Sequence, residues 1–217
     1  MRLAELSERS GISTATIKYY LREGLLPPGE RISATQAEYG EEHLRRLRLV
    51  RALVQVGRVP VATAREVLAA VTDESADRLS RLGTAVAALP PATPAPGEDA
   101  AARLAERKAE EVQRRLGWRI VPDNPAHRTL VSALSALIRL GYPCEMEHLL
   151  PYGEAAARLA EHDISLIEDF TAPATQLEAA VALTVLYEPV LLSLRRLAQA
   201  EEAARRFRPD TGDGTQG

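Results

Sequence analysis

Nearly every apolar run in this chain of 217 residues repeats at helical spacing, and clear alternating strand patterns are almost absent. Alanine and leucine, which are strong helix formers, dominate long stretches. Hydrophobic residues make up 46% of the sequence but aromatic residues only 4%, so a packed core must consist mostly of Leu, Val and Ala. These features predict a mainly α-helical protein of one domain or two modest ones.

The N-terminal region predicts two short helices joined by a tight turn. The first is expected over about residues 2–9 and the second over about residues 14–23, with Gly11 and Gly24 as their stops. Ser13 is a good N-cap for the second helix, because its hydroxyl can accept a hydrogen bond from a free backbone N–H. Two short helices around a glycine-containing turn indicate a helix-turn-helix.

A segment rich in proline and glycine follows over residues 25–40, and it is long enough for a small two-stranded hairpin. Two further helices are expected over residues 41–56 and 61–71. The first of them is identified by apolar residues at helical spacing, namely Leu44, Leu47, Val50 and Val54.

The centre of the chain contains its clearest linker, the proline-rich loop 90–98, since proline lacks a backbone donor. Residues 73–89 before it are compatible with another helix. A highly charged helix is expected over residues 99–117, with apolar residues spaced 4-3-4 at Ala105, Ala109, Val112 and Leu116. This spacing predicts a dimerisation seam for a partner helix. The alternative, in which the helix folds back onto its own domain, stays open.

Residues 118–207 predict an all-α domain. Asn124 is an expected N-cap followed by proline at the first helical position. Further helices are expected over residues 145–159, 165–170 and 176–206. Pro189 is expected to kink the last helix, and residues 208–217 are expected to be a disordered tail.

Charge is unevenly distributed along the chain, although its formal net value is only −3. Residues 1–60 hold 10 basic and 7 acidic side chains, whereas residues 61–217 hold 17 and 23. The basic excess therefore coincides with the predicted helix-turn-helix, as nucleic-acid binding requires.

The sequence predicts a cytoplasmic protein. Its single cysteine, Cys144, excludes an intramolecular disulfide. The longest apolar run, around residues 181–194, contains Glu188 and Pro189, so no membrane span is expected. Met1 leads directly into a polar amphipathic pattern that is unlike a signal peptide.

Four motifs occur in a specific order within residues 1–71. They are Gly11-Ile12-Ser13, Tyr19-Tyr20, Gly24-Leu25-Leu26-Pro27-Pro28 and Leu44-Arg45-Arg46-Leu47. Together with the hairpin-sized gap, they resemble the DNA-binding domain of the MerR family of transcriptional regulators. The resemblance implies a winged helix-turn-helix with a β-hairpin wing, followed by a long helix that dimerises. It also implies binding to a palindromic operator in double-stranded DNA and contact with RNA polymerase.

This resemblance, together with the basic residues of the second helix, predicts the DNA contacts. They are Ser13, Thr14, Ala15, Thr16, Lys18, Tyr19, Tyr20, Arg22, Arg31, Arg45 and Arg46. Adjacent residues on a helix do not share a face, so one of the two tyrosines is expected in the core and the other at a phosphate.

The chain departs from the family pattern in two places. The family usually has an arginine where this chain has Ala15, and a Tyr-Arg pair where its wing has Gln36 and Ala37. The chain therefore lacks two phosphate contacts that its relatives use.

The C-terminal region is expected to bind a small organic effector, because it is apolar and holds a few polar anchors. Candidate effector-binding residues are Trp118, Tyr142, Tyr152, Phe170, Tyr187 and Glu188. A charge such as Glu188 in an apolar stretch needs a partner, for example Arg195, Arg196 or a cationic ligand. The alternative is that these residues only pack a bundle core or a dimer face.

No metal site or cofactor is predicted. A metal sensor would need several soft ligands, whereas Cys144 and His148 form a single pair, expected to be a buried thiol and a surface imidazole. The four histidines are scattered singly and are expected at the surface. No phosphate-binding glycine loop, nucleophile elbow or zinc motif is found, so no catalytic residue is predicted.

Two hypotheses follow for the whole chain. The first is a dimeric, ligand-responsive transcription regulator of the MerR type. The alternative is a ligand-independent DNA-binding repressor or architectural protein whose C-terminal domain serves only dimerisation.

Overall fold

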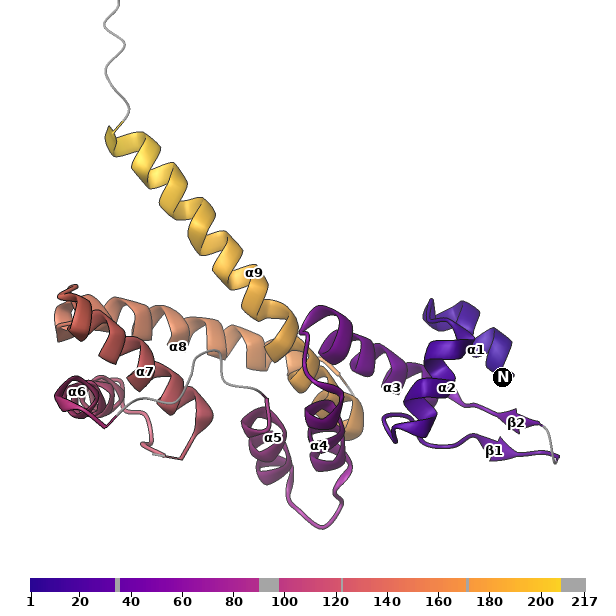
Figure 1. Ribbon diagram of the computed structural model, residues 1–217. Helices are drawn as coiled ribbons and strands as arrows, with labels where there is room; N and C mark the ends of the chain where they lie inside the picture. The colour runs from indigo at the N-terminus through magenta and orange to yellow at the C-terminus, as the bar shows by residue number, and fades with distance from the viewer. Residues whose placement is uncertain (34–35, 90–97, 122, 171, 208–217) are drawn as a thin grey trace, which may run out of the picture.

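The computed structural model describes residues 1–33, 36–89, 98–121, 123–170 and 172–207 (Figure 1). The described part of the chain is mainly α-helical, with one small antiparallel hairpin, as the sequence predicts. Its elements in chain order are α1 (Leu3–Ser10), α2 (Thr14–Arg22), β1 (Glu30–Arg31), β2 (Ala37–Glu38), α3 (Glu41–Arg51), the π-helix η1 (Ala52–Val56), α4 (Val61–Thr72), α5 (Arg78–Ala87), α6 (Ala100–Arg115), α7 (Pro125–Leu140), α8 (Met146–Glu168) and α9 (Pro173–Phe207). The proline-rich residues 90–97 and the tail 208–217 lie outside the described residues.

The first five helical elements and the hairpin form a winged helix-turn-helix. In the hairpin, Glu30 lies opposite Glu38 and Arg31 opposite Ala37. Leucine, isoleucine and valine fill the core of this domain, and its fully buried members are Leu6, Ile17, Leu25, Leu47, Val50, Leu53, Ala64 and Val67. Burying these side chains is the main source of its stability.

The helix caps are where the sequence places them. The Ser13 hydroxyl accepts a hydrogen bond from the Thr16 backbone N–H at 3.1 Å. Asn124 accepts one from the Ala126 N–H at 2.8 Å. Gly141 ends α7 with a φ of 71°, a left-handed conformation that glycine adopts at little cost.

Two helices differ from the predicted boundaries. The helix expected over residues 41–56 ends as the π-helix η1, whose extra residue per turn lets the Gly57 N–H reach the Ala52 carbonyl at 2.8 Å. The segments expected over 145–159 and 165–170 are one continuous helix, α8. Pro151 lies inside α8 near its start, where its missing N–H removes one hydrogen bond without ending the helix.

The seam predicted on α6 is filled by α7 of the same chain. Ala105 and Ala109 are fully buried, and they pack with Val131, Leu134 and Cys144. This is the fold-back arrangement rather than a seam open to a partner. Its physical reason is that small alanine side chains let a second helix approach closely.

Two histidines expected at the surface are buried instead. His127 on α7 bonds to the Gln113 side chain at 2.8 Å and to the Glu106 carboxylate at 2.7 Å, so it fastens α7 to α6. His43 packs edge-on against Tyr39, with the ring centroids 5.2 Å apart. Both ring nitrogens of His127 have partners, which offsets the cost of burying a polar ring. His43 Nδ1 accepts from the Gly40 N–H at 3.0 Å, whereas its Nε2 has no hydrogen-bond partner in the described part of the chain.

The long helix α9 joins the two parts of the molecule. Its first half packs on η1 and on α3 to α5, and Leu177, Val181 and Val185 belong to the core of the DNA-binding domain. Gly57 makes this packing close, since a Cβ there would lie 2.2 Å from a methyl carbon of Val185. The second half is exposed and extends beyond the other helices (Figure 1).

Residues Thr175–Phe207 of α9 are also long and apolar enough to cross a membrane, with a mean hydropathy of 1.6 over 18 residues. From the sequence no membrane span is expected here, because Glu188 and Pro189 interrupt the apolar run. One helix that meets a length and composition criterion is weak support for a membrane span, since core helices of soluble proteins meet it too.

Candidate nucleic-acid interface and ligand pocket

Helix α2 has one buried face and one exposed face. Ile17 and Tyr20 are almost fully buried against the domain core. The exposed face carries short polar, basic and aromatic groups, which are Ser13, Thr14, Ala15, Lys18, Tyr19 and Arg22. A helix that is held by its apolar face and presents such groups outward can enter the major groove of DNA.

The two adjacent tyrosines are divided between core and surface. Tyr20 is buried, and the Gln55 side chain from η1 hydrogen-bonds its hydroxyl. Burial is the main cause that raises the pKa of Tyr20. Tyr19 is 37% exposed, and the Arg22 guanidinium lies 5.3 Å from its ring centroid. The predicted DNA contact at Tyr20 therefore falls on a core residue, and Tyr19 holds the outward position.

The wing follows this helix and extends away from the helical body of the domain (Figure 1). Its Arg31 and Gln36 are exposed to solvent. The Arg2 guanidinium hydrogen-bonds the Gln36 side chain. The hairpin is also fastened to the N-terminus, because the backbone groups of Met1 and Tyr39 bond to each other at 2.8 and 2.9 Å. Gln36 and Ala37 stand where the family usually has a Tyr-Arg pair, and the Gln36 side-chain oxygen accepts the hydrogen bond from Arg2, which precedes α1.

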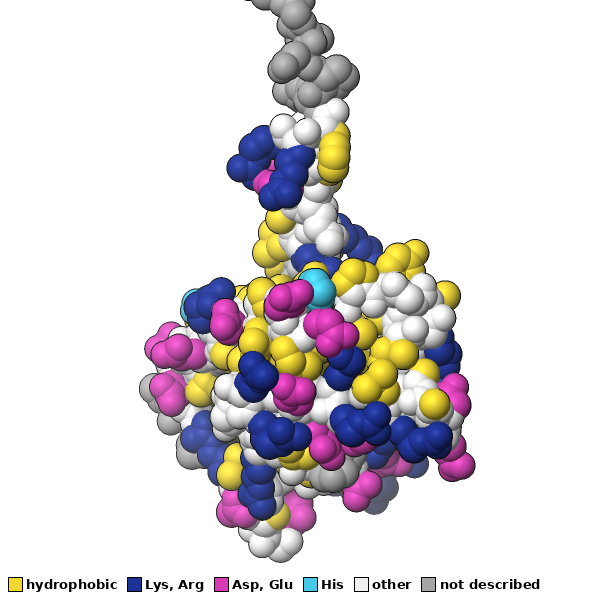
Figure 2. Space-filling model, turned by 90° about the vertical axis from the view of Figure 1, so that its left-hand side faces the viewer, with side chains coloured by type: hydrophobic (Ala, Val, Ile, Leu, Met, Phe, Trp, Pro, Cys, Tyr) yellow, Lys and Arg dark blue, Asp and Glu magenta, His cyan; other side chains and the backbone are white. Residues whose placement is uncertain are grey.

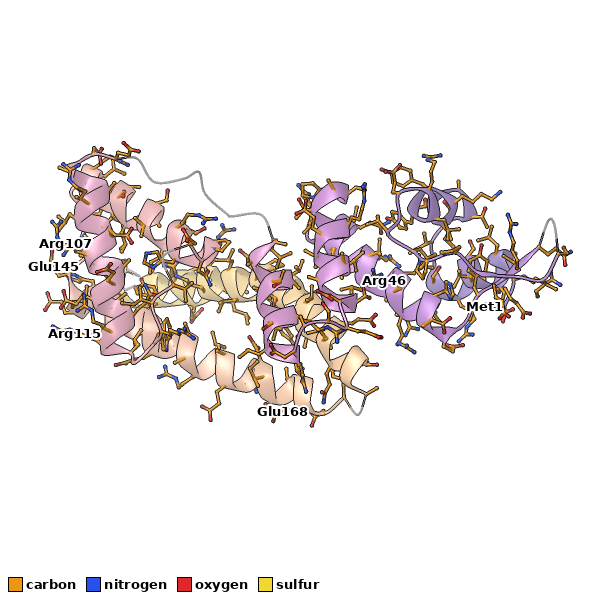
Figure 3. The ribbon with its side chains drawn as sticks, turned by 90° about the horizontal axis from the view of Figure 1, so that it is seen from below. Met1, Arg46, Arg107, Arg115, Glu145 and Glu168 are labelled. Carbon is orange, nitrogen blue, oxygen red and sulfur yellow. The ribbon has the colours of Figure 1, made fainter. Side chains whose placement is uncertain are left out.

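Arg45 and Arg46 are neighbours on α3 with different surroundings. The Arg46 guanidinium donates to the Leu25 carbonyl at 3.2 Å and to the Leu68 carbonyl at 3.3 Å, inside the domain (Figure 3). Burial lowers the pKa of Arg46. Arg45 lies nearer the surface, with its Nε 3.9 Å from Oε2 of Glu178 on α9. Arg46 therefore braces α3 against α4 instead of facing outward.

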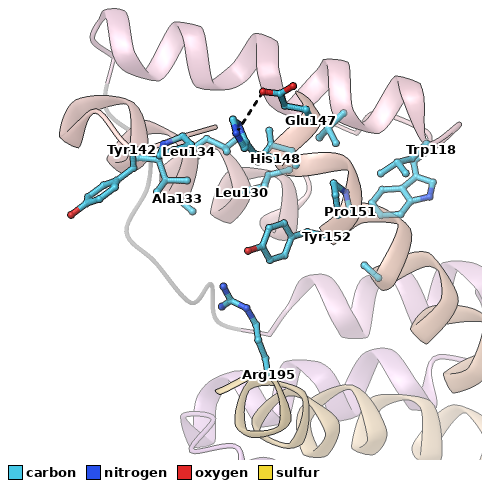
Figure 4. A pocket seen from close by; sticks show the side chains of 17 residues that line it. Trp118, Leu130, Ala133, Leu134, Tyr142, Glu147, His148, Pro151, Tyr152 and Arg195 are labelled. Carbon is cyan, nitrogen blue, oxygen red and sulfur yellow. Dashed lines mark ion pairs between the residues drawn. The ribbon is translucent and has the colours of Figure 1, made fainter. Parts of the chain in front are cut away.

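The C-terminal helices line a pocket of about 1000 Å³ that is open to solvent. Its walls come from α6, α7, α8 and the second half of α9 (Figure 4). The lining is mainly apolar and aromatic: Val112, Leu116, Trp118, Leu130, Ala133, Leu134, Leu137, Tyr142, Pro143, Glu147, His148, Leu149, Pro151, Tyr152, Gly153, Ala156 and Arg195. Hydrophobic side chains also gather between charged ones on this face of the molecule (Figure 2).

Three of the six residues predicted to bind an effector line this pocket, namely Trp118, Tyr142 and Tyr152. The other three lie elsewhere. Tyr187 and Glu188 line a smaller hollow of about 460 Å³ between α8 and α9. Phe170 lines a shallow surface near α3. The predicted set is therefore divided among three places.

Sequence reasoning missed several pocket residues. Leu130, Leu134 and Leu137 recur at helical spacing on α7, and periodicity assigns such an apolar face to a core rather than to a pocket. Arg195 was considered only as a partner for Glu188, yet no ion pair joins them in the described part of the chain, and Arg195 faces the pocket.

The pair Cys144 and His148 is separated in the fold. Cys144 lies before α8 and is buried among α6 and α7, whereas the His148 side chain is 44% exposed at the pocket. Among the described residues, no group of three His, Cys, Asp or Glu side chains is placed to hold a metal ion.

Comparison with known proteins decides the family. Residues 1–71 match the MerR HTH family of regulatory proteins. A crystal structure of a candidate transcriptional regulator from Streptomyces coelicolor A3(2), SCO5550, is 53% identical, with a TM-score of 0.82. That alignment covers 95% of this chain and 98% of the other. The chain belongs to the MerR family.

Other relatives match a shorter stretch of the chain. The HTH-type transcriptional regulator ZntR homolog of Haemophilus influenzae is 40% identical over 50 residues, which are 23% of this chain. The heavy metal-dependent transcription regulator 2 of Rhizobium meliloti is 35% identical over 75 residues, which are 35% of this chain. These alignments span only 37% and 50% of the curated relatives' lengths. The likeness to these two regulators therefore covers no more than 35% of this chain.

Proposed function

We propose that this MerR-family protein is a homodimeric, cytoplasmic transcription regulator that responds to a small organic effector. It binds double-stranded DNA through α2 and the wing, and the C-terminal helices hold the effector. The observation that carries the proposal is the exposed polar and basic face of α2, whose opposite face anchors it in the core.

The exposed groups of α2 suit both parts of DNA recognition. Lys18 has no ion pair among the described residues, so its ammonium is available to a phosphate. Arg22 is near Glu23 at 3.7 Å and stacks on Tyr19, which orients it along the same face. Thr14 and the Ser13–Thr16 hydroxyl pair are short groups that can reach base edges. Contacts to phosphates position the protein and contacts to bases specify the site.

The effector part of the proposal is supported by the pocket. A volume of about 1000 Å³ is at the upper end of the range for small-molecule sites. Trp118, Tyr142 and Tyr152 are 42%, 60% and 60% exposed at it, which is a large aromatic surface to leave in water. A bound organic molecule would remove this surface from solvent.

Dimerisation is supported by a second seam, on α9 rather than α6. Leu183, Tyr187, Val190, Leu194 and Leu197 are spaced 4-3-4-3 and lie on one stripe of the helix. All but the half-buried Leu183 are exposed. Heptad spacing is the signature of a helix-helix seam, so we propose a second copy of this chain as its occupant. A two-fold dimer would bind a palindromic operator, where the family resemblance implies contact with RNA polymerase.

Helix α9 offers the physical route from pocket to DNA. Arg195 on its second half lines the pocket, and Val185 on its first half packs into the core of the DNA-binding domain. A ligand that favours one position of α9 therefore biases the position of α3 and, through it, of the dimer's two recognition helices.

The test is footprinting of the purified protein on the DNA upstream of its own gene, over a range of salt concentrations. The wild type is compared with Lys18→Ala plus Arg22→Ala. A matched control, Arg107→Ala plus Arg158→Ala, removes the same charge from exposed positions far from α2 (Figure 3 shows Arg107). We expect a protected palindrome whose affinity falls with salt, and a shallower salt dependence only in the first variant.

Either variant result is informative. Equal loss in the two double variants would indicate that net charge, and not the face of α2, governs binding. The ligand-independent repressor would be favoured by two results together. No small molecule would alter specific DNA binding, and none would raise the melting temperature of the protein.

A further inference from the structure

The charged groups of the large pocket lie at two ends of an apolar chamber. Its charged or titratable lining groups, apart from tyrosines, are Glu147, His148 and Arg195. The Glu147 side chain is 80% exposed, and its carboxylate lies 3.7 Å from His148 Nε2. Arg195 approaches from α9 on the other side, next to Tyr152 (Figure 4). The carboxylate is thus directed to water and to an imidazole, whereas the guanidinium faces the chamber.

Arg195 is held in place but has no counter-ion. Its guanidinium carbon lies 5.4 Å from the ring centroid of Tyr152, a cation–π contact that orients the side chain. In the described part of the chain, no carboxylate forms an ion pair with it. Stacking uses the face of a guanidinium and leaves the N–H donors in its plane available. These donors match the geometry of a carboxylate or sulfonate.

We propose, on the basis of the function inferred above, that the pocket selects amphiphilic organic anions. The apolar body of such a ligand packs on the α7 and α8 walls, around Leu130, Leu134 and Pro151. Its anionic head pairs with Arg195, with the Tyr152 hydroxyl as a further donor. A neutral ligand leaves the guanidinium without an anion, and a cationic ligand meets a like charge.

The test uses a reporter that the chain already contains. Trp118 is the single tryptophan of the protein and it lines the pocket, so its fluorescence reports binding directly. Three probes with the same ten-carbon chain are titrated below their micelle concentrations: decanoate, decan-1-ol and decyltrimethylammonium. We expect decanoate to bind about tenfold more tightly than decan-1-ol, because charge-assisted hydrogen bonds are the stronger ones. We expect decyltrimethylammonium to bind most weakly.

The variant Arg195→Gln keeps a polar side chain with N–H donors and removes its charge. We expect it to abolish the preference for decanoate and to leave decan-1-ol binding unchanged. The matched control is Arg196→Gln, which changes the adjacent exposed arginine outside the pocket lining and should keep the preference.

The outcomes separate the two proposals. Equal binding of decanoate and decan-1-ol, or an unchanged preference in Arg195→Gln, overturns the anion selectivity while the pocket stands. If decyltrimethylammonium binds most tightly, the pocket selects cations and the proposal of an anionic ligand is wrong. If none of the three probes alters Trp118 fluorescence, the pocket is not an effector site for such molecules, and the effector part of the proposed function fails with it.

Discussion

Glu178 on α9 lies between two arginines of α3, and its Oε2 is 3.9 Å from Nε of Arg45. The carboxylate is largely buried, with a side chain only 19% exposed. Burial raises the pKa of Glu178, and the charges of Arg45 and Arg46 only partly oppose that rise. This charged contact sits where α9 meets the helix that follows the wing, so it couples the two parts of the protein electrostatically.

The raised pKa of Glu178 predicts a pH-dependent cost to stability. Because its pKa is higher in the folded than in the unfolded chain, the folded protein binds more protons between the two values. The Glu178 contribution to stability is therefore favourable at acidic pH and is lost as pH rises through that window. We expect Glu178→Gln to gain stability relative to wild type as pH rises from mildly acidic to neutral, in urea unfolding at several pH values. A variant that loses relative stability over that rise would mean that the pairing with Arg45 outweighs burial.

Gly57 is predicted to tolerate no side chain. Its backbone has an ordinary φ of −74°, so conformational freedom is not the reason. A Cβ would meet Val185 at 2.2 Å and the Leu53 carbonyl at 3.0 Å. We expect Gly57→Ala to destabilise the protein by about 1–3 kcal/mol, as overpacking does, measured by thermal unfolding. Gly83→Ala is the control, since nothing lies within 4 Å of its added Cβ inside α5. If both changes have equal effects, α9 is not packed closely at Gly57.

Removing the hydroxyl of Tyr20 is predicted to lower stability, whereas removing the hydroxyl of Tyr19 is predicted to weaken DNA binding. Tyr20→Phe removes the hydroxyl that Gln55 bonds, so we expect a loss of about 1 kcal/mol of stability. Tyr19→Phe removes an exposed hydroxyl, so we expect unchanged stability and weaker DNA binding. Chemical unfolding and a DNA-binding titration on both variants check this, and the reverse pattern would exchange the two roles.

Ala15 is predicted to be a position where DNA affinity can be raised. It is exposed on the outward side of α2, which we propose faces DNA, so an arginine there needs no repacking. We expect Ala15→Arg to steepen the dependence of log K on log salt by about one phosphate contact. Ala160→Arg adds the same charge to an exposed position on α8 and should leave that slope nearly unchanged. An equal change in both variants would point to general electrostatics.

The α9 seam is predicted to hold the dimer. Leu194 belongs to this seam and is 58% exposed, and Leu140 at the end of α7 is 70% exposed. We expect Leu194→Glu to give a monomer in sedimentation equilibrium, because both copies place a carboxylate in an apolar seam. Leu140→Glu should remain dimeric. A dimeric Leu194→Glu protein would place the interface elsewhere.

Local signals in the sequence were sufficient for most of the fold. Ser13 and Asn124 cap the helices that follow them, and Gly141 ends α7, because caps depend on a few adjacent residues. The ordered motifs of residues 1–71 identified the DNA-binding domain for the same reason. The π-helix after Arg51 could not be foreseen, because its form depends on packing against α9.

Periodicity could not tell which surface covers an apolar stripe. The 4-3-4 pattern at Ala105 and Ala109 is covered by α7 within the chain, whereas the similar pattern through Leu194 is exposed. The surroundings of Arg46 were likewise not evident from the sequence. Its position suggests a DNA contact, but its partners are backbone carbonyls that lie 21 and 22 residues away along the chain. The residue pattern of a single sequence does not determine which residues far apart along the chain come into contact.

The unbroken length of α9 has a mechanical consequence. Its 35 residues span about 52 Å, and about 33 Å of that length lies beyond Val185. A rotation of about 10° around the contact between Gly57 and Val185 would therefore carry the far end through about 6 Å. In such a rotation the helix would act as a lever with its pivot at this contact, so a shift of about 2 Å at Leu177, beside the DNA-binding domain, corresponds to a displacement of several ångströms at the far end.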